Sequence, residues 1–205
     1  EIDNIIKEEN IGYFYNIKYG DRKDGQLVTN CINLIHAVFV VDPHGEKYAT
    51  VSKTLADKYN NIVDYVPHMI NLPKHNDNMR EELKLPTNAI ILGRYGGYYS
   101  FDLPFVHDTI KLFLERDENV YFIFVNTKVF YSHPRIIYLS KIIDLYQKVK
   151  FINTCDAMIH GREIGETFGL SVGEFSYLNK PIITNKSEHM NAHIEILEDR
   201  AIIYN

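Results

Sequence analysis

The stretch of sequence that decides the fold is Asp156–Thr184, which reads DAMIHGREIGETFGLSVGEFSYLNKPIIT. It opens with an apolar run, Ala157–His160, continues through a polar loop that contains glycine, and then shows a helical pattern over Gly169–Leu178. The Asn179-Lys180-Pro181 turn ends that helix, and Pro181–Thr184 has the composition of a further strand. This order predicts two parallel strands joined by a helix.

The same alternation of apolar runs and amphipathic stretches extends over the rest of the chain. Further helices are expected at Phe105–Glu115 and Ile142–Ile152. The remaining strands are expected at Tyr13–Ile17, Leu34–Val41, Tyr48–Val51, Ile62–Val66, Ala89–Leu92, Val120–Val125, Ile136–Leu139 and Ala201–Tyr204. Strands that alternate with helices in this way indicate an α/β protein with a parallel sheet.

A polar connection divides the chain. Residues 71–86, NLPKHNDNMREELKLP, contain Pro73 near the start and Pro86 at the end. We therefore predict a first lobe over residues 1–72, a linker over 73–86, and a Rossmann-like second lobe over 87–205. Because the first lobe has only three or four short strands, we expect it to be the end of a larger α/β domain.

Composition and charge exclude several classes of protein. The 205 residues are 45% apolar and 24% charged, as is ordinary for a globular protein. The net charge of −5 and the lack of a basic stripe disfavour nucleic acid as a partner. No apolar run is long enough to span a bilayer, and no signal peptide is seen. Cys31 and Cys155 fit two buried thiols in a reducing compartment, so a cytoplasmic location is expected.

The loop before the Gly169–Leu178 helix is the predicted binding site. Ligands of open parallel sheets sit outside the carboxyl ends of the strands, where loops lead into helices. A helix N-terminus offers free N–H groups to an anion. We expect Phe168, Gly169 and Leu170 to present such groups, with Gly169 allowing close approach of the ligand.

One glutamate, Glu166, lies in this loop, and a second, Glu174, lies further along the helix. If most of the interval from Glu166 to Glu174 is helical, the two residues lie roughly 12 Å apart along the helix axis. That separation exceeds the roughly 5–9.5 Å between the carboxyl groups of a hydrolytic pair. The spacing therefore favours one elongated ligand that is held at two places.

Glu166 to Glu174 reads E-T-F-G-L-S-V-G-E, and the strand after it begins K-P-I-I. This pattern resembles the E-x7-E signature of retaining GT-B glycosyltransferases of family 4 type. The resemblance implies a GT-B fold, of the α/β class, in which the second Rossmann-like lobe binds the donor and the preceding α/β lobe is incomplete. It also implies that Glu166 acts on the donor sugar as a catalytic residue and that Glu174 binds the ribose hydroxyls.

The rest of the donor site follows from the same resemblance. The backbone amides of Phe168, Gly169 and Leu170 would hold phosphate and sugar. Thr167, within the motif, and His160, at the end of the preceding strand, complete the predicted set around this helix. The competing interpretation of the motif is a Rossmann helix that carries two solvated glutamates and uses Gly169 for packing.

A Gly-Arg pair ends the first strand of the second lobe in this family, and its Arg pairs with the donor diphosphate. Gly93-Arg94 has that position here, and a guanidinium suits the role because it is always charged and binds two oxygens at once. The family commonly has a lysine five residues after this arginine, where this chain has Tyr99. Arg162, or backbone N–H groups of the GRYGG segment, would have to replace that lysine.

Histidines give one further candidate. Leu34-Ile35-His36 resembles a strand whose histidine lies near the reacting sugar in some members, which assigns His36 a catalytic role. The alternative is a satisfied interior histidine. His189 and His193 have the helical spacing of metal ligands, but no third ligand is near them in the sequence, so no metal site is predicted. The family generally needs no metal, and no cofactor is expected besides the nucleotide sugar.

The expected function is transfer of a sugar from a nucleoside-diphosphate donor to an acceptor hydroxyl with retention of configuration. The sequence leaves the base, the sugar and the acceptor open: the acceptor could be a glycan, a lipid or a protein, and a lipid would imply peripheral association with a membrane. A non-catalytic nucleotide-sugar-binding module is the alternative. A Rossmann oxidoreductase is disfavoured because no G-x-G-x-x-G follows a strand.

Overall fold

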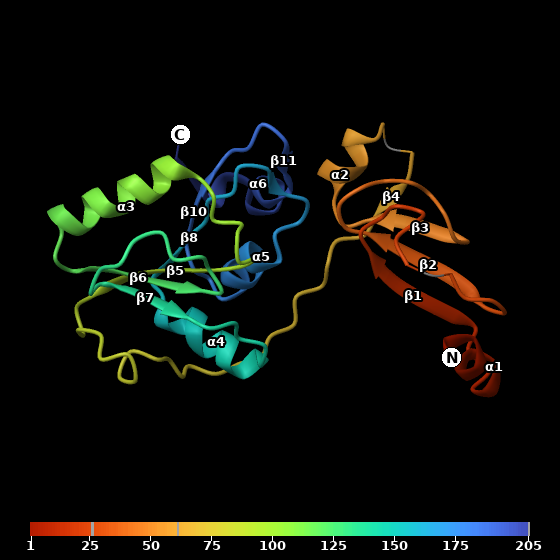
Figure 1. The fold of residues 1–205 in the computed structure, drawn as a ribbon, viewed down its shortest axis with the longest axis horizontal. Coiled ribbons are helices and arrows are strands. Elements are labelled where there is room, and N and C mark those ends of the chain that lie inside the picture. Colours follow the sequence, from red (N-terminus) through yellow and green to blue (C-terminus); the bar gives the residue numbers. More distant parts are fainter. Residues whose placement is uncertain (26, 61, 205) are drawn as a thin grey trace. The chain divides into compact units, whose positions relative to one another are not determined.

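The computed structural model describes residues 1–25, 27–60 and 62–204. Gln26, Asn61 and Asn205 fall within the predicted lobes and lie outside the described residues. The chain divides into two compact units (Figure 1). The first unit comprises Glu1–Met69, Glu166–Phe168 and Met190–Ala192, and the second comprises Ile70–Gly165, Gly169–His189 and His193–Asn205.

The first unit is built on a four-stranded parallel sheet in the order β1-β2-β3-β4. Its elements before residue 70 are α1 (Ile2–Glu8), β1 (Tyr13–Lys18), β2 (Ile32–Ala37), β3 (Lys47–Thr50), α2 (Lys53–Lys58) and β4 (Asp64–Tyr65). Helix α2 begins where it does because the side chain of Ser52 accepts a hydrogen bond of 3.1 Å from the Leu55 N–H.

Two strands of this sheet are shorter than predicted. Strand β2 ends at Ala37, not at Val41, because the Phe39 and Val40 amides both donate to the Tyr19 carbonyl and the chain turns there. Strand β4 keeps only the Asp64–Tyr65 pair of the predicted Ile62–Val66 run. Both predictions were too long because they followed the apolar residues, and these continue beyond the ends of β2 and β4.

One side of strand β1 is exposed. Tyr13, Tyr15 and Ile17 alternate along the strand, and they are 65%, 56% and 59% exposed. Parallel sheets usually have both faces covered. Among the described residues, this face of β1 therefore lacks the usual covering layer.

The second unit is built on a six-stranded parallel sheet in the order β12-β10-β8-β5-β6-β7. The strands are β5 (Ile90–Tyr95), β6 (Val120–Val125), β7 (Ile136–Leu139), β8 (Ala157–Ile159), β10 (Ile182–Asn185) and β12 (Ala201–Tyr204). Its main helices are α3 (Pro104–Arg116), α4 (Leu145–Thr154), α5 (Leu170–Tyr177) and α6 (Ala192–Leu197), followed by a 3-10 turn, η1 (Glu198–Arg200).

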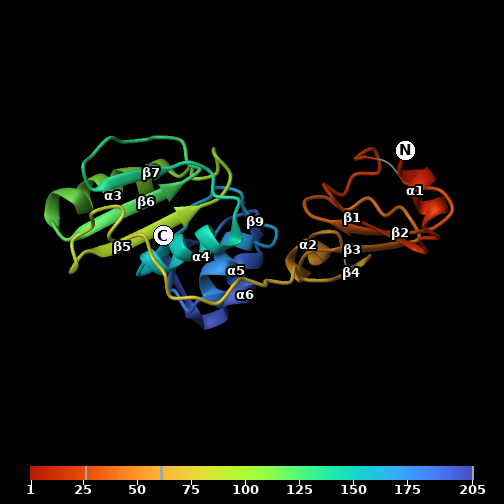
Figure 2. The same cartoon turned by 90° about the horizontal axis from the view of Figure 1, so that it is seen from below.

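Helices cover both faces of this sheet, as Figures 1 and 2 show. Helix α3 packs on one face through a cluster that includes Ile110 and Phe122. Helices α4 and α5 pack on the other face through a cluster that includes Phe151 and Phe175. The carboxyl ends of all six strands meet at one edge because the strands are parallel, and the loops that precede α3 and α5 leave from that edge.

Gly93 allows the close packing of β5 on the α4 side of the sheet. A Cβ atom at this position would lie 2.2 Å from the Cys155 Sγ and 3.2 Å from the Phe151 ring. Cys155 itself is buried, and burial raises the pKa of its thiol well above the usual range. The structure thus gives Gly93 a packing reason that is independent of any ligand.

The predicted α/β class and the parallel Rossmann-like sheet are confirmed. Strands β6, β7 and β12 have the predicted bounds. Helix α4 begins at Leu145 and not at Ile142, because Asp144 caps it by accepting a hydrogen bond of 2.8 Å from the Gln147 N–H. None of the helices in the described part of the chain has the length and apolar character needed to cross a membrane.

Candidate functional site

Helix α5 begins at Leu170, one residue after Gly169. Gly169 is the N-cap and has a left-handed backbone with φ of 87°, a conformation that glycine adopts without strain. The first helical hydrogen bond runs from the Gly173 N–H to the Gly169 carbonyl, at 2.9 Å. The amides of Leu170, Ser171 and Val172 are therefore the ones that the helix leaves without helical partners. Phe168 was expected among these groups, but it precedes the helix, and its side chain is buried.

Glu166 lies outside helix α5. It belongs to the short strand β9 (Gly165–Glu166), which forms a two-stranded sheet with β11 (Met190–Asn191). Thr167 and Phe168 connect this strand to the N-cap of α5. The estimate of roughly 12 Å between the two glutamates assumed a mostly helical interval, and it does not apply because the helix starts only at Leu170.

Glu174 is buried in the middle of α5. It is 9% exposed, and its Oε1 accepts a hydrogen bond of 2.9 Å from the Lys148 ammonium of helix α4. Burial raises the pKa of this carboxyl to about 7. Its second oxygen, Oε2, is buried and has no hydrogen-bond partner among the described residues. The interpretation of Glu174 as a solvated glutamate is therefore wrong.

Lys148 is held from a second side by Tyr95, the last residue of β5. The Lys148 Nζ lies 5.3 Å from the centre of the Tyr95 ring, a cation–π arrangement. The Tyr95 ring in turn stacks on Phe175 of α5, at 6.1 Å between centres. The Tyr95 hydroxyl is the other buried polar atom in this cluster for which the described residues provide no partner. Lys148 thus contacts two residues, Glu174 and Tyr95, that each have one buried polar atom without a partner among the described residues.

Arg94, near the end of strand β5, is 3% exposed, and residues of two neighbouring loops bind its guanidinium. Its guanidinium donates to the Thr127 hydroxyl at 2.6 Å, to the Ser100 hydroxyl at 2.7 Å and to the Gly97 carbonyl at 3.1 Å. These bonds tie the loop after β5 to the loop after β6. Arg94 therefore sits at the carboxyl edge of the sheet, as predicted, but it also organises the structure there.

A lysine lies near the position where the resemblance expects one. Tyr99 is 73% exposed, and the Lys128 Nζ is 5.8 Å from the centre of its ring. The Lys128 N–H also donates to the Tyr98 carbonyl at 2.9 Å. Of the proposed substitutes for the missing lysine, Arg162 is fixed through its backbone N–H, which donates to Asn185 Oδ1 at 3.2 Å.

His160 is buried directly after β8. Its Nδ1 is 2.8 Å from the Thr184 hydroxyl, and its carbonyl accepts a hydrogen bond of 2.5 Å from the Tyr204 hydroxyl. Its ring lies 5.0 Å from that of His193. These contacts place His160 at the carboxyl edge of the sheet and give it a structural role in joining β8, β10 and β12.

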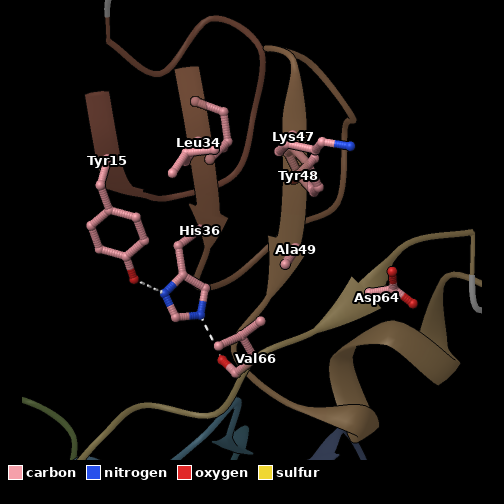
Figure 3. Close-up of a pocket in the computed structure, with 9 residues that line it drawn as sticks. Tyr15, Leu34, His36, Lys47, Tyr48, Ala49, Asp64 and Val66 are labelled. Carbon is pink, nitrogen blue, oxygen red and sulfur yellow. Dashed lines mark hydrogen bonds between the residues drawn. The ribbon is translucent and has the colours of Figure 1, made fainter. Parts of the chain in front are cut away.

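His36, in the first unit, has both ring nitrogens engaged, as Figure 3 shows. Nε2 is 2.7 Å from the Val66 carbonyl, so Nε2 carries the proton. Nδ1 then accepts from the Tyr15 hydroxyl. The ring lines a hollow of about 320 Å³ with Lys47 and Asp64. His36 is thus a satisfied histidine that still borders a cavity.

The histidine pair and the two cysteines do not form a site in the part of the chain that the structure describes. His189 precedes β11 and His193 lies in α6, so the two do not share a helix. Among the described residues, no group of three His, Cys, Asp or Glu side chains is arranged to hold a metal ion. Cys31 is only partly buried, unlike Cys155, and both cysteines are free thiols.

No protein-family model matches the sequence, and no curated protein matches it. Solved structures do match. HepE of Anabaena, in complex with UDP-glucose, superposes with a TM-score of 0.66 at 13% identity over 86% of this chain and 59% of HepE. A glycosyltransferase from Rickettsia africae superposes with a TM-score of 0.67 at 15% identity, covering 97% of this chain and 63% of that one.

The chain has the GT-B fold. WaaG, a glycosyltransferase involved in lipopolysaccharide biosynthesis, also matches, with a TM-score of 0.58 at 11% identity over 97% of this chain and 71% of WaaG. Identities this low establish the fold only. The GT-B chain described here spans 59% and 63% of the length of HepE and the Rickettsia protein.

Sequence reasoning missed Lys148, Tyr95 and Lys128. Lys148 sits on an amphipathic helix, where a lysine usually points to solvent, and nothing in the sequence indicates that it faces Glu174, 26 residues away. Tyr95 directly follows Arg94, so the sequence indicates that it lies at the end of a strand. The sequence does not indicate that its hydroxyl is buried without a hydrogen-bond partner among the described residues.

Proposed function

We propose that this chain carries the donor-binding part of a retaining glycosyltransferase, which moves a sugar from a nucleoside-diphosphate sugar to an acceptor hydroxyl. The observation that supports this most is the carboxylate of Glu174. A buried carboxylate with an oxygen that lacks a partner is costly unless a ligand supplies a donor. In the proposal that donor is a ribose hydroxyl, and the Glu166–Glu174 resemblance and the GT-B fold support the same assignment.

The diphosphate would lie at the start of α5. There the amides of Leu170, Ser171 and Val172 lack helical partners and the helix dipole favours negative charge. Arg94, at the same edge of the sheet, adds positive charge. These groups would stabilise the charge that develops on the leaving diphosphate, with Glu166 at the sugar end. We therefore expect transfer without an added metal, unaffected by EDTA.

A test of transfer follows the donor and the product separately. UDP-glucose, GDP-mannose and ADP-glucose are each incubated with the chain, with water as the acceptor hydroxyl, and phosphorus NMR follows release of the nucleoside diphosphate. Proton NMR of the anomeric centre then reports retention or inversion. Release with retention supports the proposal, whereas a product of inverted configuration would contradict the retaining mechanism.

The second candidate is a nucleotide-sugar-binding module without transfer activity. The second unit has its own six-stranded sheet and hydrophobic core, which is the framework that a nucleotide-binding module needs. Binding of a nucleotide sugar with no release of diphosphate, under conditions where a full-length GT-B enzyme turns over, would favour this second candidate. Failure to bind any of the three donors would contradict both.

A further inference from the structure

The contact between Lys148 and Glu174 does more than neutralise a buried charge. Both side chains are desolvated, at 17% and 11% exposed, and they come from different helices. Burial lowers the pKa of the Lys148 ammonium and raises that of the Glu174 carboxyl. Burial therefore pushes both groups toward their neutral forms, and the attraction between the two charges opposes this.

The two oxygens of the Glu174 carboxylate have different surroundings. Oε1 is bound to Lys148, and Oε2 has no partner among the described residues. The last torsion of a glutamate is soft, so the carboxylate can turn while one oxygen stays on the ammonium. An ionised carboxylate accepts at both oxygens, whereas a protonated one donates from one of them. The ionised form can accept from Lys148 and from two neighbouring hydroxyls together, whereas the protonated form carries a donor on one of its oxygens.

We propose that Lys148 is a positioning residue for nucleoside binding: it keeps Glu174 ionised and oriented, and thereby makes the affinity for the nucleotide rise with pH through neutrality. This inference rests on the proposed function, because the ligand is taken to be the ribose of a nucleoside diphosphate. The groups that face Glu174 are Lys148 from α4 and, beneath the ammonium, the Tyr95 ring from β5.

The experiment measures dissociation constants from pH 5.5 to 9 by calorimetry. The probes are the tightest binder among UDP, GDP and ADP, and the 2′,3′-dideoxy form of that nucleotide, which lacks the ribose hydroxyls. For the wild type, the affinity for the ribonucleotide rises through neutral pH, while the affinity for the dideoxy form changes little. The ratio of the two affinities isolates the hydroxyl contact from the diphosphate contact.

Variants of Lys148 test whether this residue sets the ratio of the two affinities. Lys148→Met should lower the ribonucleotide affinity at pH 7.5 by about 10- to 100-fold, the range for a lost charge-assisted hydrogen bond. It should also move the midpoint of the pH profile upward, because the carboxyl loses its counter-charge. Lys148→Arg should restore most of the wild-type profile. Lys150→Met is the matched control, since Lys150 lies on the same helix and forms an ion pair with Glu82.

The possible failures can be told apart. If no nucleoside diphosphate binds the wild type, the proposed function fails and this inference fails with it. If the nucleotide binds but Lys148→Met keeps the wild-type midpoint and affinity ratio, only the role of Lys148 is refuted. Should Lys148→Met not fold, carbon NMR titration of labelled glutamates decides the point, with Lys148→Arg and Glu174→Gln compared to the wild type. A Glu174 carboxyl that titrates at the ordinary pH of an exposed glutamate would overturn the proposal.

Discussion

Lys148 on helix α4 and Glu174 on helix α5 form a largely buried ion pair, with 2.9 Å between Nζ and Oε1 and side chains that are 17% and 11% exposed. The two helices lie side by side on one face of the second unit's sheet, and both contribute to its core. The pair thus places a carboxylate beside the hydrophobic cluster that α4 and α5 form on this face of the sheet. Such a group needs a reason beyond packing, because replacing a buried pair by apolar residues often costs nothing.

The stability of the protein should reflect this pair in a pH-dependent way. The folded pKa of Glu174 is raised above its unfolded value, so the folded state binds more protons between about pH 4.5 and 7 and stability falls as pH rises through that window. Glu174→Gln should remove this part of the slope. Urea unfolding at pH 5 and pH 8 measures it, and an identical slope in the variant would contradict the assignment.

Lys148→Met should destabilise the second unit more at pH 8 than at pH 5. At high pH it leaves an ionised carboxylate without its partner, which costs about 1–3 kcal/mol. At low pH the carboxyl takes up a proton and most of that cost disappears. Chemical denaturation at both pH values tests this, and an equal loss at both would show that Lys148 acts only through packing.

Gly93→Ala should destabilise the second unit by about 1–3 kcal/mol, the usual cost of overpacking a core. The added Cβ would lie 2.2 Å from the Cys155 Sγ. Because Cys155→Ala removes that sulfur, the double variant should be more stable than the sum of the single effects predicts. Strictly additive effects in a double-mutant cycle would refute the contact.

Gly169→Ala should destabilise helix α5 by about 1–2 kcal/mol, since its φ of 87° is unfavourable for a residue with a Cβ. Gly169→Asn should cost less, because asparagine tolerates this conformation better. Thermal unfolding of the three proteins gives the order. If alanine and asparagine cost the same, backbone strain is not the cause.

The strand–loop–helix–strand order around Glu166–Glu174 was predictable because strand composition, glycine and the Asn-Lys-Pro turn all point the same way. The start of α5 was misplaced because the backbone of Gly169 caps the helix, and no side chain marks that cap. The burial of Arg94 and Glu174 could not be predicted, since it depends on Thr127 and Lys148, which are distant in sequence.

Binding of a nucleoside diphosphate by the second unit should depend on Glu174. Calorimetric titration of the wild type, Glu174→Ala and the exposed control Glu118→Ala with UDP, GDP and ADP tests it most directly. The wild type and the control should bind one nucleotide equally well, and Glu174→Ala should bind it about 10-fold or more weakly. Equal binding by Glu174→Ala, or no binding of any nucleotide by the wild type, would contradict it.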